Sequence, residues 1–182
     1  LLRLGTLCRR PSGVRHSIDV ADRRLARIVS HCRDLPGQEL FQYLDETSER
    51  RSVTSTDINA YLRDVTGREV SAKDFRTWAG TVLCAVALRE IEACGSETEA
   101  KRNVAQVVKQ VSQQLGNTPA VCRASYIDPR VIDRYREGAT IKVAMEDLGE
   151  NAVPGQPTTQ GPIEAAVLDL LDEGAGGKEA AA

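Results

Sequence analysis

Two prolines that each follow a capping residue set the helix boundaries in the C-terminal half of the chain. In Thr118-Pro119 and Asp128-Pro129, the first residue has a side chain that can accept a hydrogen bond from the first turn of a helix. The proline that follows suits the first helical position. Gly116, just upstream, is a typical helix end. The pattern predicts that one helix ends at Gly116 and that two short helices follow, with Tyr126 at the end of the first and just before the second.

Apolar residues that recur at spacings of three and four predict two helices in the N-terminal half. The first begins at Asp22 and ends before Pro36-Gly37. The second follows the capping candidates Thr54 and Ser55 and ends at Gly67. The residues expected to face inward are Leu25, Ile28, Val29 and Cys32 in the first helix, and Ile58, Tyr61, Leu62 and Val65 in the second.

Two longer helices are predicted next. Ser71 caps the third, with Asp74 at the position where a carboxylate can return a bond to the cap. Ser96 and Glu99 form a capping box for the fourth, which ends at Gly116. The inward residues are expected to be Phe75, Trp78, Ala79, Val82, Leu83, Val86 and Ala87 in the third helix, and Val104, Val107, Val108, Val111 and Leu115 in the fourth.

The remaining patterns complete a mainly α fold with a small β element near the N-terminus. Leu40 to Leu44 and the run around Ser52-Val53 are expected to pair across the polar turn from Asp45 to Arg51. Residues 1–148 are read as one domain, 149–161 as a linker and 174–182 as a disordered tail. Residues 162–173 form an amphipathic helix, for which docking back on the body is favoured over binding a partner. Its inward residues are Ile163, Ala166, Val167, Leu170 and Leu171.

Charge and cysteine content exclude several classes of protein. Residues 1–136 hold 22 Lys and Arg against 17 Asp and Glu, whereas residues 137–182 hold 2 against 9. A basic body with an acidic tail suits a surface that meets phosphates, with ordinary surface charge as the alternative. The five cysteines form no CxxC pair, so neither a disulfide framework nor a zinc site is indicated, and Cys84 is expected in the core. No membrane-spanning run is present in the sequence, and we expect a soluble, cytoplasmic protein.

Tyr126 lies nine positions after Asn117, in a polar segment rich in helix-start signals. A phenol can attack a phosphodiester only if neighbouring donors stabilise charge on the phosphate and hold the hydroxyl in line. Upstream, the segment from Lys73 to Trp78 offers the guanidinium of Arg76 for that role. Tyr126, Arg76 and Asn117 are the candidate catalytic residues. From the residues alone, a surface salt bridge remains the alternative for Arg76 and a helix-capping role the alternative for Asn117.

Four stretches of the chain together resemble the catalytic domain of type IB DNA topoisomerases of the bacterial, poxvirus-like group. They are Asp34 to Tyr43, Asp57 to Gly67, Lys73 to Gly80, and Asn117 to Pro129. The resemblance covers most of residues 18 to 145 and implies a helical DNA breaking and rejoining core. The chain opens with Leu-Leu-Arg rather than Met, from which we expect an N-terminally incomplete catalytic domain.

The resemblance implies a role for each candidate. Tyr126 is expected to be the nucleophile that forms a 3′-phosphotyrosyl link. Arg76 would donate to the scissile phosphate through its guanidinium, and Asn117, at a position held by histidine in some relatives, would donate to a non-bridging oxygen without titrating. Candidate phosphate contacts are Lys73, Arg123 and Arg130, with solvated surface charge as the alternative. The tyrosines expected only to pack, with hydrogen-bonded hydroxyls, are Tyr43, Tyr61 and Tyr135.

Two pieces implied by the resemblance are missing from the sequence. One is an arginine upstream of this region, and the other is a general-acid lysine in a glycine-rich hairpin, where Pro11 stands here. Proline can neither donate a proton nor complete a strand ladder, and the neighbouring Arg9 and Arg10 hold their protons too tightly to serve as acids near neutral pH. We therefore expect this polypeptide alone to cleave DNA slowly or not at all.

The resemblance also implies the partners. It points to double-stranded DNA, monomeric action in the bacterial nucleoid, no membrane, and neither ATP, metal nor another cofactor. Three alternatives remain open from the sequence: a catalytically impaired DNA-binding remnant, a tyrosine recombinase, and a helical interaction module that uses residues 162–173. Recombinases usually carry a His-x-x-Arg pair ahead of the tyrosine, and none stands between Arg76 and Tyr126.

Overall fold

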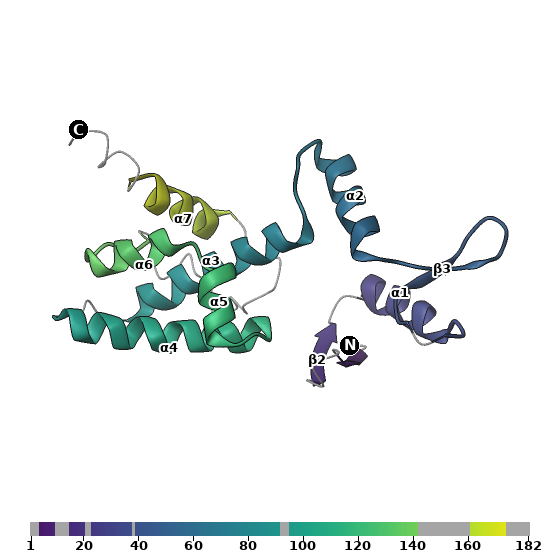
Figure 1. The fold of residues 1–182 in the computed structure, drawn as a ribbon, viewed down its shortest axis with the longest axis horizontal. Helices are drawn as coiled ribbons and strands as arrows, with labels where there is room; N and C mark the ends of the chain where they lie inside the picture. Colours follow the sequence, from purple (N-terminus) through teal and green to yellow (C-terminus); the bar gives the residue numbers. More distant parts are fainter. Residues whose placement is uncertain are drawn as a thin grey trace. The chain divides into compact units, whose positions relative to one another are not determined.

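The computed structural model describes residues 4–9, 15–20, 23–37, 39–91, 95–141 and 161–173, with residues 4–9, 15–20 and 173 described as backbone only. The described part is mainly helical, which confirms the predicted fold class (Figure 1). It divides into two compact units, Leu1–Ala72 and Lys73–Ala182, and each is treated by itself below. Over the described ranges, no helix has both the length and the apolar character needed to cross a membrane.

The first unit contains, over its described residues, two small antiparallel sheets and two helices. Strand β1 (Leu4–Arg9) pairs with β2 (Arg15–Val20), followed by α1 (Arg23–Asp34). Strand β3 (Gln42–Leu44) pairs with β4 (Arg50–Ser52), followed by α2 (Ser55–Thr66). The second pair confirms the predicted hairpin. The first pair was not predicted, because Pro11 argued against a ladder; its last pair is Arg9 with Arg15, and Pro11 lies in residues 10–14, outside the described residues.

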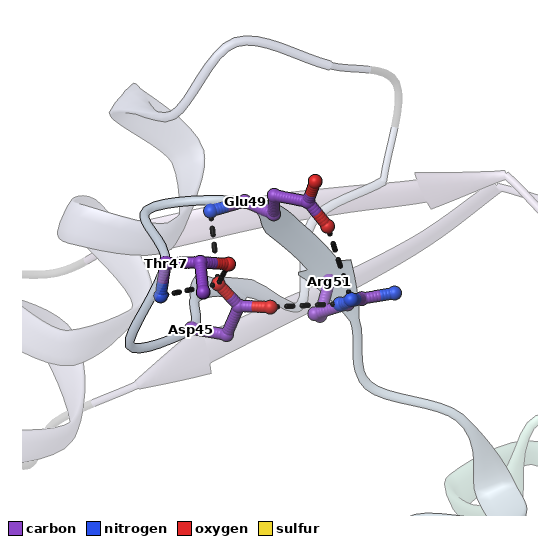
Figure 2. Close-up of polar contacts among 4 residues, drawn as sticks. All are labelled: Asp45, Thr47, Glu49 and Arg51. Atoms are coloured by element: carbon purple, nitrogen blue, oxygen red, sulfur yellow. Dashed lines mark hydrogen bonds and ion pairs between the residues drawn. The ribbon is translucent and has the colours of Figure 1, made fainter.

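A single carboxylate closes the turn between β3 and β4 (Figure 2). Asp45 Oδ1 accepts hydrogen bonds from the Thr47 hydroxyl at 2.7 Å, from Thr47 N at 3.0 Å and from Glu49 N at 2.9 Å. Its Oδ2 accepts from Arg51 Nε at 3.0 Å. The hydrogen bonds from Thr47 and then Arg51 hold the pKa of Asp45 below its usual value. The turn therefore fixes the register in which Leu44 faces Arg50.

The ends of α2 match the prediction, but the buried faces of α1 and α2 do not. Thr54 accepts from Asp57 N and the Asp57 carboxylate accepts from Thr54 N, while Gly67 ends the helix at φ 63°. The buried residues of α1 are Ala26 and Val29. Of the residues expected to be buried, those exposed in the structure are Leu25, Ile28, Ile58, Tyr61 and Val65. Periodicity predicts which residues share a face but not whether another element covers that face.

The second unit consists, over its described residues, of five helices. They are α3 (Ala72–Glu90), α4 (Glu97–Leu115), α5 (Pro119–Ser125), α6 (Pro129–Arg136) and α7 (Pro162–Glu173). Helix α4 packs against α5 and α6, and α6 packs against α7, so α6 lies between α4 and α7 (Figure 1). The buried core consists of Val82, Cys84, Ala85, Leu88, Ala100, Val104, Val107, Val108, Val111, Cys122, Ile127, Val131, Ile132, Tyr135, Ile141, Ile163, Val167, Leu170 and Leu171. The predicted face of α4 is thereby confirmed, with Leu115 half-buried against the core.

The predicted face of α3 is right in part and wrong in part. Val82 is buried as predicted, and Leu83, Val86 and Ala87 are half-buried against the core. Phe75 and Ala79 are exposed, and Trp78 is only half-buried. The residues that are buried are Gly80, Thr81, Val82, Cys84, Ala85 and Leu88. Apolar residues occur nearly all round the middle of this helix, so their spacing does not single out a face.

Helix α7 packs against the other helices of the second unit, which is the docking that the sequence favoured. Ile163, Val167, Leu170 and Leu171 are at most 4% exposed and belong to the core, whereas Leu168 on the opposite side is 50% exposed. A polar contact adds to this packing, because Trp78 Nε1 donates to Glu164 Oε1 at 2.7 Å. The C-terminal helix is therefore part of the body that holds α3 in place.

Candidate functional site

The segment from Gly116 to Asp128 forms the predicted helix junctions. Gly116 ends α4 in the left-handed conformation at φ 64°. The Thr118 side chain caps α5 and the Asp128 side chain caps α6, each followed by proline in the first turn. Tyr126 is the residue that caps the C-terminus of α5, and its N–H donates to Cys122 O at 2.9 Å. Tyr126 therefore lies between two helix ends, as the prolines predicted.

Three small residues on one face of α3 hold this segment close. Thr77 Oγ1 is 3.3 Å from Ser125 O, and Thr81 Oγ1 accepts from Asp128 N at 3.0 Å. Between these contacts, Gly80 lies directly under the carbonyl of Tyr126. Sequence reasoning missed all three residues, although an isolated glycine inside a helical pattern is a signal for close packing.

Gly80→Ala is expected to destabilise the protein. An added Cβ would lie 2.2 Å from the Tyr126 carbonyl oxygen, a backbone atom that moves only with the chain. This clash outweighs the about 1 kcal/mol by which alanine is the better helix former. We expect a net loss of about 1–3 kcal/mol in urea unfolding.

Gly95→Ala is the matched control for this substitution. An added Cβ at Gly95 meets nothing within 4 Å, and Gly95 has no left-handed backbone to strain. Its effect on the free energy of unfolding should stay within about 0.5 kcal/mol. Equal unfolding midpoints for Gly80→Ala and the parent would contradict the close approach of α3 to Tyr126.

Arg76 and Tyr126 come together in the structure. The Arg76 guanidinium carbon lies 5.1 Å from the centroid of the Tyr126 ring, within the range of a cation–π contact. One branch of the fork is occupied, because Arg76 Nη2 donates to the carbonyl of Leu115 at the end of α4. The Nε atom of Arg76 is buried and has no hydrogen-bond partner. A buried donor of a charged group is thus left without an acceptor beside the phenol ring.

Asn117 is the second residue with a buried donor lacking a partner. It stands two residues after the Leu115 carbonyl that Arg76 contacts, and its N–H donates to Ser112 O at 2.9 Å. Its side-chain Nδ2 is buried without a hydrogen-bond partner. The helix ends on either side of Asn117 are capped by its neighbours, Gly116 for α4 and Thr118 for α5. Local backbone structure therefore leaves the Asn117 amide donor unused.

The three candidate phosphate contacts are all exposed, but one of them is engaged. Lys73 and Arg123 lie on exposed positions of α3 and α5. Arg130 Nη2 forms an ion pair with Asp128 Oδ2 at 2.8 Å, and Arg130 Nε donates to both oxygens of the same carboxylate. This contact lowers the pKa of Asp128 and raises that of Arg130. The Arg130 guanidinium is therefore already paired with the Asp128 carboxylate.

The other tyrosines differ from one another. Tyr135 is buried, and its hydroxyl accepts from Asn103 Nδ2 at 2.9 Å, which confirms the expected packing role. Tyr43 and Tyr61 are 52% and 65% exposed, so the expectation that they pack was wrong. Neither lies on a face that another element of the first unit covers.

Helices α3 and α5 each carry a buried thiol, Cys84 and Cys122. Burial raises the pKa of Cys84 to about 12, and the nearby Cys122 adds to this shift. Burial also raises the pKa of Cys122, while the charge of Arg76 opposes the shift. Both thiols are thus held neutral, in keeping with the core role expected for Cys84. The described residues include no group of three or more His, Cys, Asp or Glu side chains arranged to hold a metal ion.

Two comparisons with known proteins match this chain. A family model described as eukaryotic DNA topoisomerase I, catalytic core, matches residues 12–150, a span that includes Arg76, Asn117 and Tyr126. DNA topoisomerase 1B of Acanthamoeba polyphaga mimivirus is 32% identical over 115 residues, which cover 56% of this chain and 32% of the viral protein. The match therefore spans about a third of the length of that curated relative.

Proposed function

Since the chain belongs to the type IB DNA topoisomerase family, we propose that it carries a centre that cleaves and rejoins one strand of duplex DNA, with Tyr126 as nucleophile. Arg76 and Asn117 bind the scissile phosphate in this proposal. The product of cleavage is a 3′-phosphotyrosyl link, and rotation about the uncut strand relaxes supercoils before the ends rejoin.

The pair of unused donors carries the proposal. Arg76 Nε and Asn117 Nδ2 are both buried without an acceptor, and Arg76 lies over the Tyr126 ring. Leaving such a donor unsatisfied costs about 1–3 kcal/mol each, and more for a charged group. The non-bridging oxygens of a phosphodiester are anionic acceptors that remove this cost. An unpaired guanidinium donor beside the phenol, and an unpaired amide donor just after α4, thus support the proposal of a phosphate site.

The reaction uses no bond energy beyond that of the DNA strand itself. The Tyr126 oxygen forms a bond to phosphorus, the bond from phosphorus to the 5′ oxygen breaks, the phenol loses a proton and the 5′ oxygen gains one. The phosphotyrosyl ester conserves the cleaved bond, so the reverse attack by the 5′ hydroxyl rejoins the strand without ATP. The donors of Arg76 and Asn117 stabilise the extra negative charge on the phosphate oxygens in both directions.

Exposed cations supply the remaining contacts with DNA in this proposal. Lys73 and Arg123 lie on the same two helices that hold Arg76 and Tyr126. Contacts of this kind neutralise phosphates without reading bases, so binding should weaken steeply as salt concentration rises.

A trapping experiment tests the function. The substrate is a duplex with a 5′-sulfur in place of the scissile 5′ oxygen, because a thiolate, with a pKa of about 8.5 in cysteine, leaves without a general acid. This choice removes the effect of Pro11 on the outcome. Cleavage should give a denaturant-resistant protein–DNA adduct, and peptide mapping should place the DNA on Tyr126. Salt-sensitive DNA binding with no adduct on this substrate would instead identify a DNA-binding remnant without chemistry.

A further inference from the structure

Thr81 is one of the few buried polar side chains among the described residues. It is 2% exposed and lies on the face of α3 that meets the segment after α5. Its hydroxyl donates to Thr77 O at 2.9 Å, one turn back in the same helix, and accepts from Asp128 N at 3.0 Å. Both the proton and an acceptor site of this hydroxyl are therefore engaged, which is what a buried hydroxyl requires.

The second of these bonds lies two residues beyond Tyr126. On the other side of Tyr126, Ser125 O is within 3.3 Å of Thr77 Oγ1. Between the two contacts, the Tyr126 carbonyl lies against Gly80, and the Ile127 side chain is buried in the core. The chain is thus attached to α3 just before and just after the phenol. Since Arg76 lies on α3 too, the same helix sets both partners of the Arg76–Tyr126 contact.

We propose that Thr81 is a positioning residue for Tyr126: by accepting from Asp128 N, its hydroxyl holds the phenol at the distance from Arg76 at which a phosphate can be attacked. The inference rests on the proposed function for its catalytic consequence, but not for the placement itself. Thr81 contacts no reacting atom in this proposal. It acts through the backbone that it ties to α3.

Substitution of Thr81 by valine or by serine distinguishes the effect of the hydroxyl from the effect of the side-chain volume. Thr81→Val keeps the shape but removes the acceptor that Asp128 N has among the described residues, so the segment must shift to reach another. Thr81→Ser keeps the hydroxyl and loses only a methyl group. Val107→Ala is the control for a loss of core packing that leaves the Thr81 hydroxyl in place, because Val107 is fully buried in α4 and belongs to the core.

Two measurements on the full chain decide placement without any activity. The first is hydrogen exchange of the Asp128 amide by NMR, which should be protected in the parent and in Thr81→Ser and unprotected in Thr81→Val. The second is the ring-current shift that the Tyr126 ring places on the Arg76 side chain, which should be lost only in Thr81→Val. The proposal would be overturned if Thr81→Val kept the parental protection of the Asp128 amide from exchange, or kept the parental ring-current shift on Arg76.

A third measurement tests the catalytic consequence. At saturating DNA, the rate of adduct formation by Thr81→Val should fall about 10- to 100-fold, since a shift of about 1 Å in a reacting group can cost as much as 10²-fold. DNA affinity should be unchanged, Thr81→Ser should retain the rate, and Val107→Ala should lose stability without losing rate. A parental rate in Thr81→Val would overturn the positioning role. If the parent itself forms no adduct, the proposed function fails. The exchange of the Asp128 amide and the ring-current shift on Arg76 then still decide whether Thr81 positions Tyr126.

Discussion

Tyr126→Phe is expected to leave no covalent adduct with DNA on either an oxygen or a sulfur leaving group. The substitution removes only the phenolic oxygen that forms the bond to phosphorus, and no other group of the side chain can replace it. The phenyl ring keeps its place under Arg76, because the cation–π contact needs the ring and not the hydroxyl. The measurement is denaturing gel analysis of the trapped complex, with DNA affinity measured in parallel and expected to be unchanged.

Tyr135→Phe is the matched control for the loss of a tyrosine hydroxyl. Its hydroxyl is buried and accepts from Asn103 Nδ2, so its removal should cost stability and leave adduct formation intact. The opposite pattern is expected for Tyr126, whose hydroxyl is the proposed nucleophile and makes no hydrogen bond to another described residue. An adduct formed by Tyr126→Phe, with DNA mapped to another residue, would disprove the assignment of the nucleophile.

Arg76→Met is expected to lower the rate of adduct formation by about 10²–10³-fold while leaving stability nearly unchanged. The rate falls because removal of one preorganised donor to a developing charge typically costs that much. Stability changes little because opposing effects nearly cancel. The variant removes a buried charged donor without a partner, which relieves about 1–3 kcal/mol or more, and it loses one hydrogen bond from a charged group, of about 1.5–3 kcal/mol. It also loses a cation–π contact of about 0.5–1 kcal/mol.

The measurements are single-turnover cleavage at saturating DNA and urea unfolding of the free protein. Arg102→Met, at an exposed position of α4, is the control for the loss of one positive charge and should alter the rate little at saturation. A large drop in stability for Arg76→Met would show that Arg76 serves the fold rather than the phosphate. An unchanged rate would contradict its proposed contact with the scissile phosphate.

Signals that act over a few residues were sufficient to predict the elements around the site. Helices α2 and α4 end at Gly67 and Gly116, and helices α5 and α6 begin at Pro119 and Pro129, as predicted. Tyr126 lies at the predicted junction between α5 and α6. The hairpin between β3 and β4 and the inward face of α4 were also predicted. Caps, prolines and left-handed glycines determine the backbone within one turn, so the sequence nearby is enough to recognise them.

The sequence also singled out Arg76, Asn117 and Tyr126, although 41 and nine positions separate them along the chain. Their roles rested on a resemblance, and the structure adds the contact of Arg76 with the Tyr126 ring and the two buried donors without acceptors. The donors could not be inferred from the sequence, because whether a side-chain nitrogen has an acceptor depends on every element that packs around it.

The buried face of α3 was predicted only in part, because tertiary structure decides the rest of it. By sequence, Phe75 and Ala79 belonged to the buried stripe, but Gly80 and Thr81 occupy it, because the segment from Ser125 to Asp128 approaches α3 too closely for a larger side chain. Helical periodicity is a property of one helix, whereas burial is a property of the pair that packs together. The local sequence therefore determined where Tyr126 stands in the chain, and only the packing of α3 against the segment around it decided which residues hold Tyr126 in place.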